Sequence, residues 1–281
     1  AWSEAPGWTE KDRQRRRYLG CQARPRSDCV VKLRLDPRCV PVHKPQRNGG
    51  VLETRRELTH DISEFGFRLE RPQVFEPGQY ALAMLPGVTG ARAYSMSNVS
   101  LDGRQWEFQV RRVPGGSGSA ALFDSLRAGD PVELDGPYGM AWLRRDAPRD
   151  ILCIAGGSGL APMISIARAA MVERRLAGRR LDFVYGARTP ADVCGEDMLR
   201  ELPGWGERLG YLAAVSLPPD DGAAWSGPIG FVHEIARERF GARLAELEIY
   251  FAGPPQMANA VQQVLFEAKV PSEQVHFDQF Y

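Results

Sequence analysis

The chain has 281 residues, of which 43% are hydrophobic and 25% charged, the balance of an ordinary globular protein of about two domains. Its net charge is +1, from 36 basic and 35 acidic residues, so no overall field favours nucleic acid or a membrane surface as a partner. No apolar stretch approaches the roughly 20 residues that cross a bilayer. The five cysteines, an odd and scattered number, predict reduced thiols and a cytoplasmic location.

The segment 46–147 has the pattern of a small β domain. Short runs of alternating polarity are separated by turn signals such as "EPGQ" and "VPGG", and we expect strands over 51–58, 62–70, 79–85, 106–113 and 131–136. Strands at this spacing predict an antiparallel barrel or sandwich. One helix is expected over 119–129, because Leu122 and Leu126 lie one turn apart and Gly129 is a stop signal.

The segment 148–281 has a different pattern. Residues 150–157 form a continuous apolar run, which is typical of a strand covered on both faces. Helix-like and strand-like stretches then alternate to the C-terminus, over 161–178, 181–188, 209–216, 230–241, 248–255, 257–270 and 275–281. This alternation predicts an open α/β domain with a parallel sheet, so the expected fold class is mixed. We expect a β domain over 46–147 and an α/β domain over 148–281, preceded by a separate segment over 1–45.

A glycine-rich loop follows the first of these buried strands. Gly156, Gly157 and Gly159 would let backbone amides approach an anion at the start of a helix, and Pro162 suits its first turn. The GxGxxP spacing differs from the GxGxxG of dinucleotide-binding Rossmann folds, and Leu160 excludes a GxSxG nucleophile elbow. Taken alone, the loop is also compatible with a tight turn that binds nothing.

Two further loops have the same character. In "VPGGSGS" (113–119), Gly115 and Gly116 precede the expected helix, Ser119 is a possible N-cap, and the loop amides suit another phosphate. In "AGPPQM" (252–257), Gly253, Pro254 and Pro255 follow a strand whose carboxyl end is a usual ligand position in open α/β sheets. Each loop by itself is also compatible with an ordinary turn.

Together and in order, these segments resemble the ferredoxin–NADP reductase superfamily of flavoproteins. "RAYSMSN" (92–98) resembles its RxYSxxN flavin motif, "GGSGS" its GGxxS motif and "GGSGLAP" its GGxGxxP nicotinamide-nucleotide motif. "YGAR" and "AGPPQM" resemble its YGxR and CGPPxM elements, although Ala252 replaces the usual cysteine. The resemblance covers residues 50–281.

The resemblance implies an FAD site. Tyr94 would stack on the isoalloxazine ring, Arg92 would pair with the pyrophosphate, and Ser95 would hydrogen-bond near the reactive N5, roles that suit these side chains. Gly115, Gly116 and Ser119 would hold the flavin phosphates. Asn98 is expected to stabilise the backbone at the end of the strand.

The resemblance also implies an NADH site. The pyrophosphate would lie on Gly156, Gly157, Gly159 and Pro162, and the nicotinamide against Gly253, Pro254 and Pro255. Arg188 and Asp192 resemble the GxRxxxD arrangement of NADH users. Because an acidic group would repel the 2′-phosphate of NADPH, NADH is the expected coenzyme.

Besides Ser95, the catalytic candidates are Asp278 and Tyr281, near the C-terminus. Tyr281 or Phe280 would cover the flavin face opposite Tyr94 and be displaced by the nicotinamide. Asp278 is either an acidic neighbour of the ring or a solvated terminal charge. Surface or packing roles are expected for the histidines, at positions 43, 60, 233 and 276.

Residues 18–35 resemble the end of a plant-type ferredoxin domain. In "LGCQARPRSD", Cys21 matches the fourth ligand of a 2Fe–2S cluster, whose other three cysteines lie upstream as C-x₄-C-x₂-C. Cys29 and Cys39 lack that spacing. We therefore expect the cluster in an intact protein that continues before Ala1, and not in these 281 residues alone. A buried thiol without a metal is the alternative.

The function implied is that of an NADH-dependent flavoprotein reductase. Electrons would pass from NADH through FAD, and through 2Fe–2S in the intact protein, to a ferredoxin component or a terminal oxygenase that hydroxylates an aromatic substrate. This domain order resembles the reductases of carbazole-type dioxygenases and phenol hydroxylases. A stand-alone flavin or ferric reductase, and a nucleotide-sensing module without activity, are the alternatives.

Overall fold

The computed structural model describes residues 10–15, 17, 25–32, 39–217 and 225–278. The chain divides into one unit over 1–40 and another over 41–281. In the first unit, helix α1 (Glu10–Gln14) is a single short turn, and Cys29 is exposed. Cys21 lies outside the described residues. Nowhere in these ranges is a helix both long and apolar enough to span a membrane.

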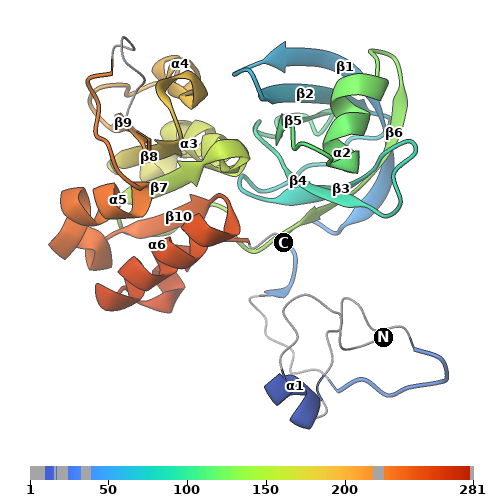
Figure 1. The fold of residues 1–281 in the computed structure, drawn as a ribbon, viewed down its shortest axis with the longest axis horizontal. Helices are drawn as coiled ribbons and strands as arrows, with labels where there is room; N and C mark the ends of the chain where they lie inside the picture. Colours follow the sequence, from blue (N-terminus) through green and yellow to red (C-terminus); the bar gives the residue numbers. More distant parts are fainter. Residues whose placement is uncertain (1–9, 16, 18–24, 33–38, 218–224, 279–281) are drawn as a thin grey trace. The chain divides into compact units, whose positions relative to one another are not determined.

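Six antiparallel strands form the first half of the larger unit (Figure 1). They are β1 (Gln46–Glu57), β2 (Ile62–Leu69), β3 (Tyr80–Met84), β4 (Arg92–Ser95), β5 (Gln105–Arg111) and β6 (Pro131–Tyr138). Their order is β4-β3-β6-β1-β2-β5, and a bridge between Met96 and Phe108 joins the two edges. The sheet is therefore a nearly closed barrel, and the predicted fold of this half is confirmed.

Alternation along the strands gives the barrel its two faces. On β5, the side chains of Trp106, Phe108 and Val110 are buried in the barrel core. The residues between them must then point outward, because successive side chains of a strand lie on opposite sides of a sheet. That outer face of β5 meets the second half of the unit.

The helix predicted over 119–129 is shorter and begins earlier. Helix α2 (Ser117–Ala120) continues as a π-helical turn, η2 (Ala121–Ser125). Its N-cap is Gly116, so the prediction that Ser119 is the N-cap is wrong. Gly115, at φ 72°, turns the chain into the helix before Ser119 is reached.

A five-stranded parallel sheet forms the second half, as the alternating pattern predicted. It contains β7 (Ile151–Gly156), β8 (Leu181–Ala187), β9 (Leu209–Val215), β10 (Glu248–Ala252) and β11 (Val275–His276) in the order β11-β10-β7-β8-β9. The chain moves outward from β7 to β9 and then returns to β10 on the other side of β7. A crevice therefore opens at the carboxyl ends of β7 and β10, where such sheets bind ligands.

Helices cover both faces of this sheet (Figure 1). Cys153 of β7 packs with α3 (Leu160–Val172) and α4 (Glu196–Arg200), whereas Ile154 packs with α5 (Val232–Phe240) and α6 (Pro255–Glu267). This double cover explains the continuous apolar run of β7. Helix α3 ends at Val172, six residues before the predicted end, because a separate 3₁₀ turn, η4 (Arg174–Leu176), follows it. The other 3₁₀ turns are η3 (Gly157–Gly159), η5 (Pro190–Asp192), η6 (Gly241–Glu246) and η7 (Ser272–Gln274).

Candidate functional site

A cleft of about 700 Å³ lies between the barrel and the parallel sheet. Its walls come from β4, β5, the loop 113–119, and the loops that follow β7 and β10. The structure brings together here most of the residues singled out in the sequence, namely Arg92, Tyr94, Ser95, Gly115, Gly116, Ser119, Gly156, Gly157, Gly159, Pro162, Gly253, Pro254 and Pro255. A cleft of this size can hold most of a large cofactor.

Arg92 brings a positive charge to the barrel side of the cleft. Its guanidinium donates to the carbonyl oxygens of Thr89, Gly90 and Ala91 and to the Ser117 hydroxyl, at 3.1–3.3 Å. Among the residues that the structure describes, no carboxylate forms an ion pair with it. The charge is therefore available to a phosphate.

Tyr94 presents a flat aromatic face beside Arg92. Its ring packs against Phe108, with the centroids 6.4 Å apart, and burial raises its pKa to about 12 although Arg92 opposes the shift. The side chain is thus a neutral phenol at any physiological pH. A Cβ at Gly118 would lie 2.9 Å from both the Tyr94 hydroxyl and the Arg92 Cγ, so only glycine lets the loop pass this close.

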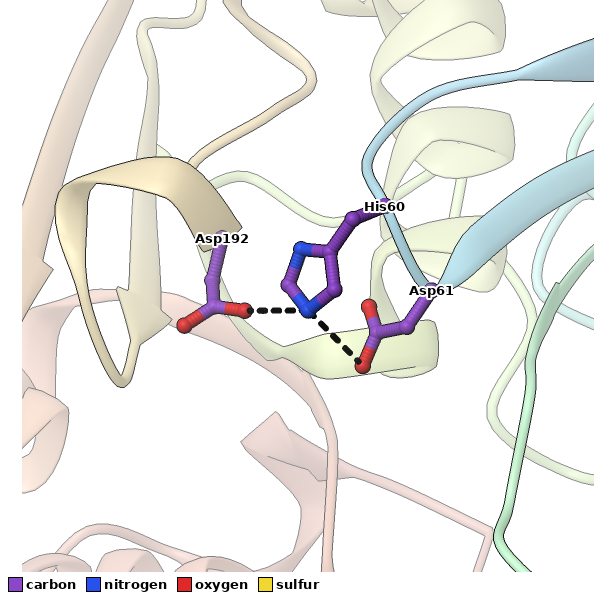
Figure 2. Close-up of side chains that lie close together, drawn as sticks. All are labelled: His60, Asp61 and Asp192. Carbon is purple, nitrogen blue, oxygen red and sulfur yellow. Dashed lines mark ion pairs between the residues drawn. The ribbon is translucent and has the colours of Figure 1, made fainter.

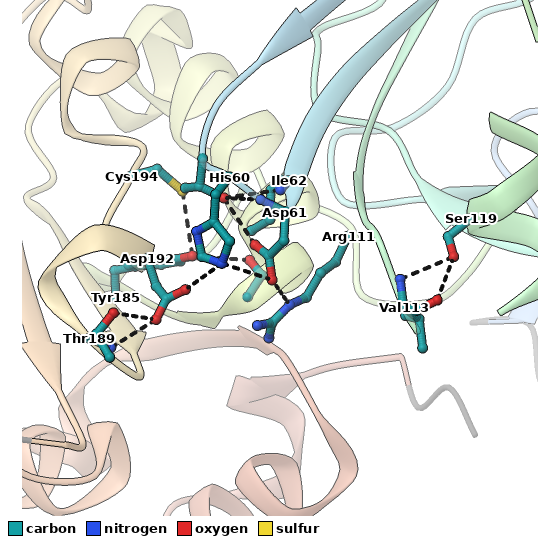
Figure 3. A network of polar contacts seen from close by, with 12 residues as sticks. His60, Asp61, Ile62, Arg111, Val113, Ser119, Tyr185, Thr189, Asp192 and Cys194 are labelled. Atoms are coloured by element: carbon teal, nitrogen blue, oxygen red, sulfur yellow. Dashed lines mark hydrogen bonds and ion pairs between the residues drawn. The ribbon is translucent and has the colours of Figure 1, made fainter. Parts of the chain in front are cut away.

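Ser119 stabilises the loop in front of α2. Its hydroxyl accepts a hydrogen bond from the Val113 N–H at 3.0 Å (Figure 3). It also lies 3.1 Å from the Gly116 carbonyl oxygen. The backbone of the loop is thereby held around the cleft. Asn98, as predicted, stabilises the backbone: its side chain donates to Gln105 O and accepts from the Glu107 N–H.

The turn after β7 fits tightly beneath the end of β10. A Cβ at Gly159 would overlap the carbonyl group of Ala252 and lie 2.7 Å from the Gly253 nitrogen. At Gly156 a Cβ would lie 2.5 Å from the Met257 sulfur. Glycine at 159 is therefore required for the two loops to meet at the crevice, whereas at 156 the contact is with a flexible side chain.

The outer face of β5 joins the two halves, and its importance was missed in the sequence. The Glu107 carboxylate lies 3.6 Å from the guanidinium of Arg168 on α3. Gln109 and Arg111 line the cleft. Arg111 also lines a neighbouring pocket and approaches Gly157. The signal was present, since polar residues alternate with core residues in "WEFQVRR".

A buried carboxylate, Glu64 of β2, lies directly across from Gln109 on the same face of the barrel. It accepts hydrogen bonds from Gln109 (2.9 Å), Ser97 (3.1 Å) and Arg56 (2.8 Å). Burial acts to raise the pKa of Glu64, but the hydrogen bonds from Gln109 and Arg56 and the charges of Arg56 and Arg168 outweigh it, and the pKa is lowered. Glu64 is therefore an ionised acceptor.

We expect Glu64→Gln to destabilise the protein in a pH-dependent manner. Because the folded-state pKa is lowered, the contribution of the ionised group is present above the ordinary value of 4.5 and is lost as pH falls through the folded-state pKa. Urea unfolding over a pH series should show wild type more stable at neutral pH, with the difference closing below 4.5. A difference that stays constant across the series would contradict this assignment.

Arg188 lies in the neighbouring pocket, of about 160 Å³, which shares Gly156, Gly157 and Pro254 with the cleft. Asp192 lines the same pocket and accepts hydrogen bonds from the Thr189 N–H (2.9 Å) and hydroxyl (2.8 Å). The two sites are thus continuous at the glycine loop.

His60 stands between two carboxylates at the edge of this pocket (Figure 2). Its Nε2 lies 3.8 Å from Asp192 and 3.9 Å from Asp61, and Asp61 in turn accepts a hydrogen bond from Arg111 at 2.6 Å (Figure 3). A protonated His60 would form ion pairs with Asp192 of the nucleotide half and with Asp61 of the barrel. His276 has an internal packing role, beside Glu248 at 2.6 Å.

Asp278 is not the solvated charge that the sequence left open. It is partly buried, accepts a hydrogen bond from the Met140 N–H at 3.1 Å, and has a pKa raised by burial. It lies at the turn after β6 and is not among the residues that line the cleft. Phe280 and Tyr281 lie outside the described residues.

The residues of the cleft fit a flat, doubly phosphorylated ligand. Arg92 supplies an unneutralised charge, Tyr94 a ring face, and the glycine loops supply backbone amides. The buried Gln109 Oε1 has no hydrogen-bond partner among the described residues. These features together suit FAD on the barrel side and a nicotinamide nucleotide on the sheet side.

Comparison with known families agrees with this division. Residues 50–142 match the oxidoreductase FAD-binding domain, and residues 153–263 match the oxidoreductase NAD-binding domain. The fold and the cleft therefore define an NADH-dependent oxidoreductase that uses FAD.

Individual relatives narrow the class. The chain is 36% identical to the ferredoxin–NAD(P)(+) reductase CarAd of Metapseudomonas resinovorans, over 100% of this chain and 83% of that protein. It is 33% identical to the phenol 2-monooxygenase reductase component DmpP of Pseudomonas sp. (strain CF600), over 96% and 76%. The solved ferredoxin reductase in carbazole 1,9a-dioxygenase superposes with a TM-score of 0.85 at 34% identity, over 94% of this chain and 78% of that one. The chain belongs to the ferredoxin–NAD(P)(+) reductase family.

Proposed function

We propose that the protein is the reductase component of an aromatic-ring oxygenase system and delivers electrons from NADH to a ferredoxin or to the terminal oxygenase. The observation that carries this is the single cleft in which the flavin-side and nucleotide-side residues meet. Relatives from carbazole and phenol oxygenase systems support the choice of partner. When bound, FAD accepts a hydride from NADH and releases electrons singly, which iron–sulfur acceptors require.

On the flavin side, Tyr94 would stack on the ring and Ser95 would hydrogen-bond near N5. Arg92 would neutralise the pyrophosphate. The backbone amides at Gly115 and Gly116 would hydrogen-bond to the phosphates, and Ser119 would hold that loop in place. These side chains would bind and orient FAD.

On the nucleotide side, Gly156, Gly157, Gly159 and Pro162 would hold the NADH pyrophosphate, with Gly253, Pro254 and Pro255 against the nicotinamide. Arg188 and Asp192 would meet the adenosine end in the smaller pocket. The Asp192 carboxylate in that pocket would disfavour the 2′-phosphate of NADPH.

The remaining assignments extend the same proposal. Tyr281 would cover the flavin until nicotinamide displaces it. Cys21 would be the fourth 2Fe–2S ligand of a longer chain, in a ferredoxin domain ending near residue 45. The flavin domain would span 46–147 and the nucleotide domain 148–281. The scattered thiols favour a cytoplasmic location.

The test compares acceptors. FAD-loaded protein should show flavin absorption bands and should reduce cytochrome c with NADH. Turnover with free flavin alone would instead favour a stand-alone flavin reductase. A protein that binds no FAD and oxidises no NADH would favour the nucleotide-sensing alternative.

A further inference from the structure

Gln109 lies where the two halves of the molecule meet. Glu107, Gln109 and Arg111 share the outer face of β5. The Gln109 Nε2 is 3.4 Å from the Met198 sulfur of α4. The guanidinium of Arg111 would lie 3.6 Å from a Cβ added at Gly157. Gln109 is thus two residues before Arg111, the residue that approaches the glycine loop, and it also lines the large cleft.

The orientation of the Gln109 amide is fixed by Glu64. The Nε2 donates to the Glu64 carboxylate at 2.9 Å, and Ser97 and Arg56 donate to the same group. An ionised carboxylate only accepts hydrogen bonds, so the amide nitrogen must face it. The carbonyl oxygen, Oε1, must then point away from Glu64.

That oxygen has no hydrogen-bond donor among the described residues, although it is buried and Gln109 as a whole is only 3% exposed. An unpaired buried carbonyl is costly, and native proteins rarely keep one without a reason. A ligand that enters the cleft and supplies an N–H group would remove this cost.

We propose that Gln109 Oε1 accepts a hydrogen bond from the carboxamide N–H of the nicotinamide ring and so orients that ring for hydride transfer. This rests on the proposed function, because it needs NADH in the cleft. The carboxamide is the N–H donor on the reacting ring itself. Gln109 and Arg111 are two residues apart on the strand, and such residues are about 7 Å apart. If the pyrophosphate lies near Arg111 and Gly157, the ribose that joins it to the nicotinamide ring can span this distance to Gln109.

The test uses two dinucleotides that differ only at this group. The 3-acetylpyridine analogue of NAD⁺ keeps the carbonyl but lacks the N–H. Calorimetric titration of FAD-loaded wild type should show NAD⁺ binding about five- to tenfold tighter, the size of one good hydrogen bond. Gln109→Met should bind the two ligands equally.

Ser97→Ala is the matched control, because it removes another hydrogen bond from Glu64 without facing the cleft, and it should keep the preference. The inference is overturned if wild type shows no preference or if Gln109→Met retains it. It is also overturned if Gln109→Met weakens FAD and leaves the preference intact, which would assign the carbonyl to the flavin. Absence of NADH oxidation in wild type would refute the proposed function, whereas oxidation without the preference refutes only this inference.

Discussion

Gly159→Ala is expected to lower kcat/KM for NADH by about 100-fold, since sub-ångström placement of a bound substrate commonly decides rates of this size. Gly159 has ordinary helical dihedrals, φ −61° and ψ −7°, so an alanine there is not strained by its backbone. The added methyl would instead collide with the end of β10 at Ala252 and Gly253, and the two loops of the nucleotide crevice would move apart. Stopped-flow reduction of the bound flavin by NADH measures the effect directly.

Gly178→Ala is the matched control for this substitution. Gly178 lies in the same half of the molecule, and a Cβ there would meet no atom within 4 Å. This variant should react with NADH at the wild-type rate, and both variants should retain FAD. An unchanged kcat/KM in Gly159→Ala would show that the contact with β10 does not shape the nucleotide site.

Arg92→Met is expected to weaken FAD binding by about 30- to 100-fold, the loss of a charge-assisted contact with phosphate. Methionine retains the apolar stem that packs beside Gly118, so the loop should keep its shape. No carboxylate among the described residues pairs with Arg92, so its removal leaves no unpaired negative charge in the protein. The dissociation constant of FAD, from quenching of flavin fluorescence, gives the result.

Arg68→Met tests whether the effect is specific to the cleft. Arg68 is also on the barrel, but it pairs with Glu53 on the surface, where an ion pair contributes little. Its loss should leave FAD affinity unchanged. Equal weakening by the two substitutions would mean that Arg92 acts through barrel stability and not through the phosphate.

Much of the fold was accessible from sequence because its signals are local. The buried run at 150–157 requires a strand covered on both faces, and both covers are present in α3 and α6. Element ends were less accurate. Helix α2 begins at Ser117 because the positive φ of Gly115 redirects the chain, a geometry that the spacing of Leu122 and Leu126 does not encode.

The sequence determined by itself which loops are rich in glycine, which strands are buried, and which residues resemble a flavin and a nucleotide motif. Such information is carried by neighbours along the chain. Tertiary structure alone decided that Glu64 fixes the Gln109 amide, that His60 lies between Asp61 and Asp192, and that Asp278 is partly buried. Each of these depends on groups distant in sequence, whose charge, burial and hydrogen bonding are set only when the strands and loops pack together.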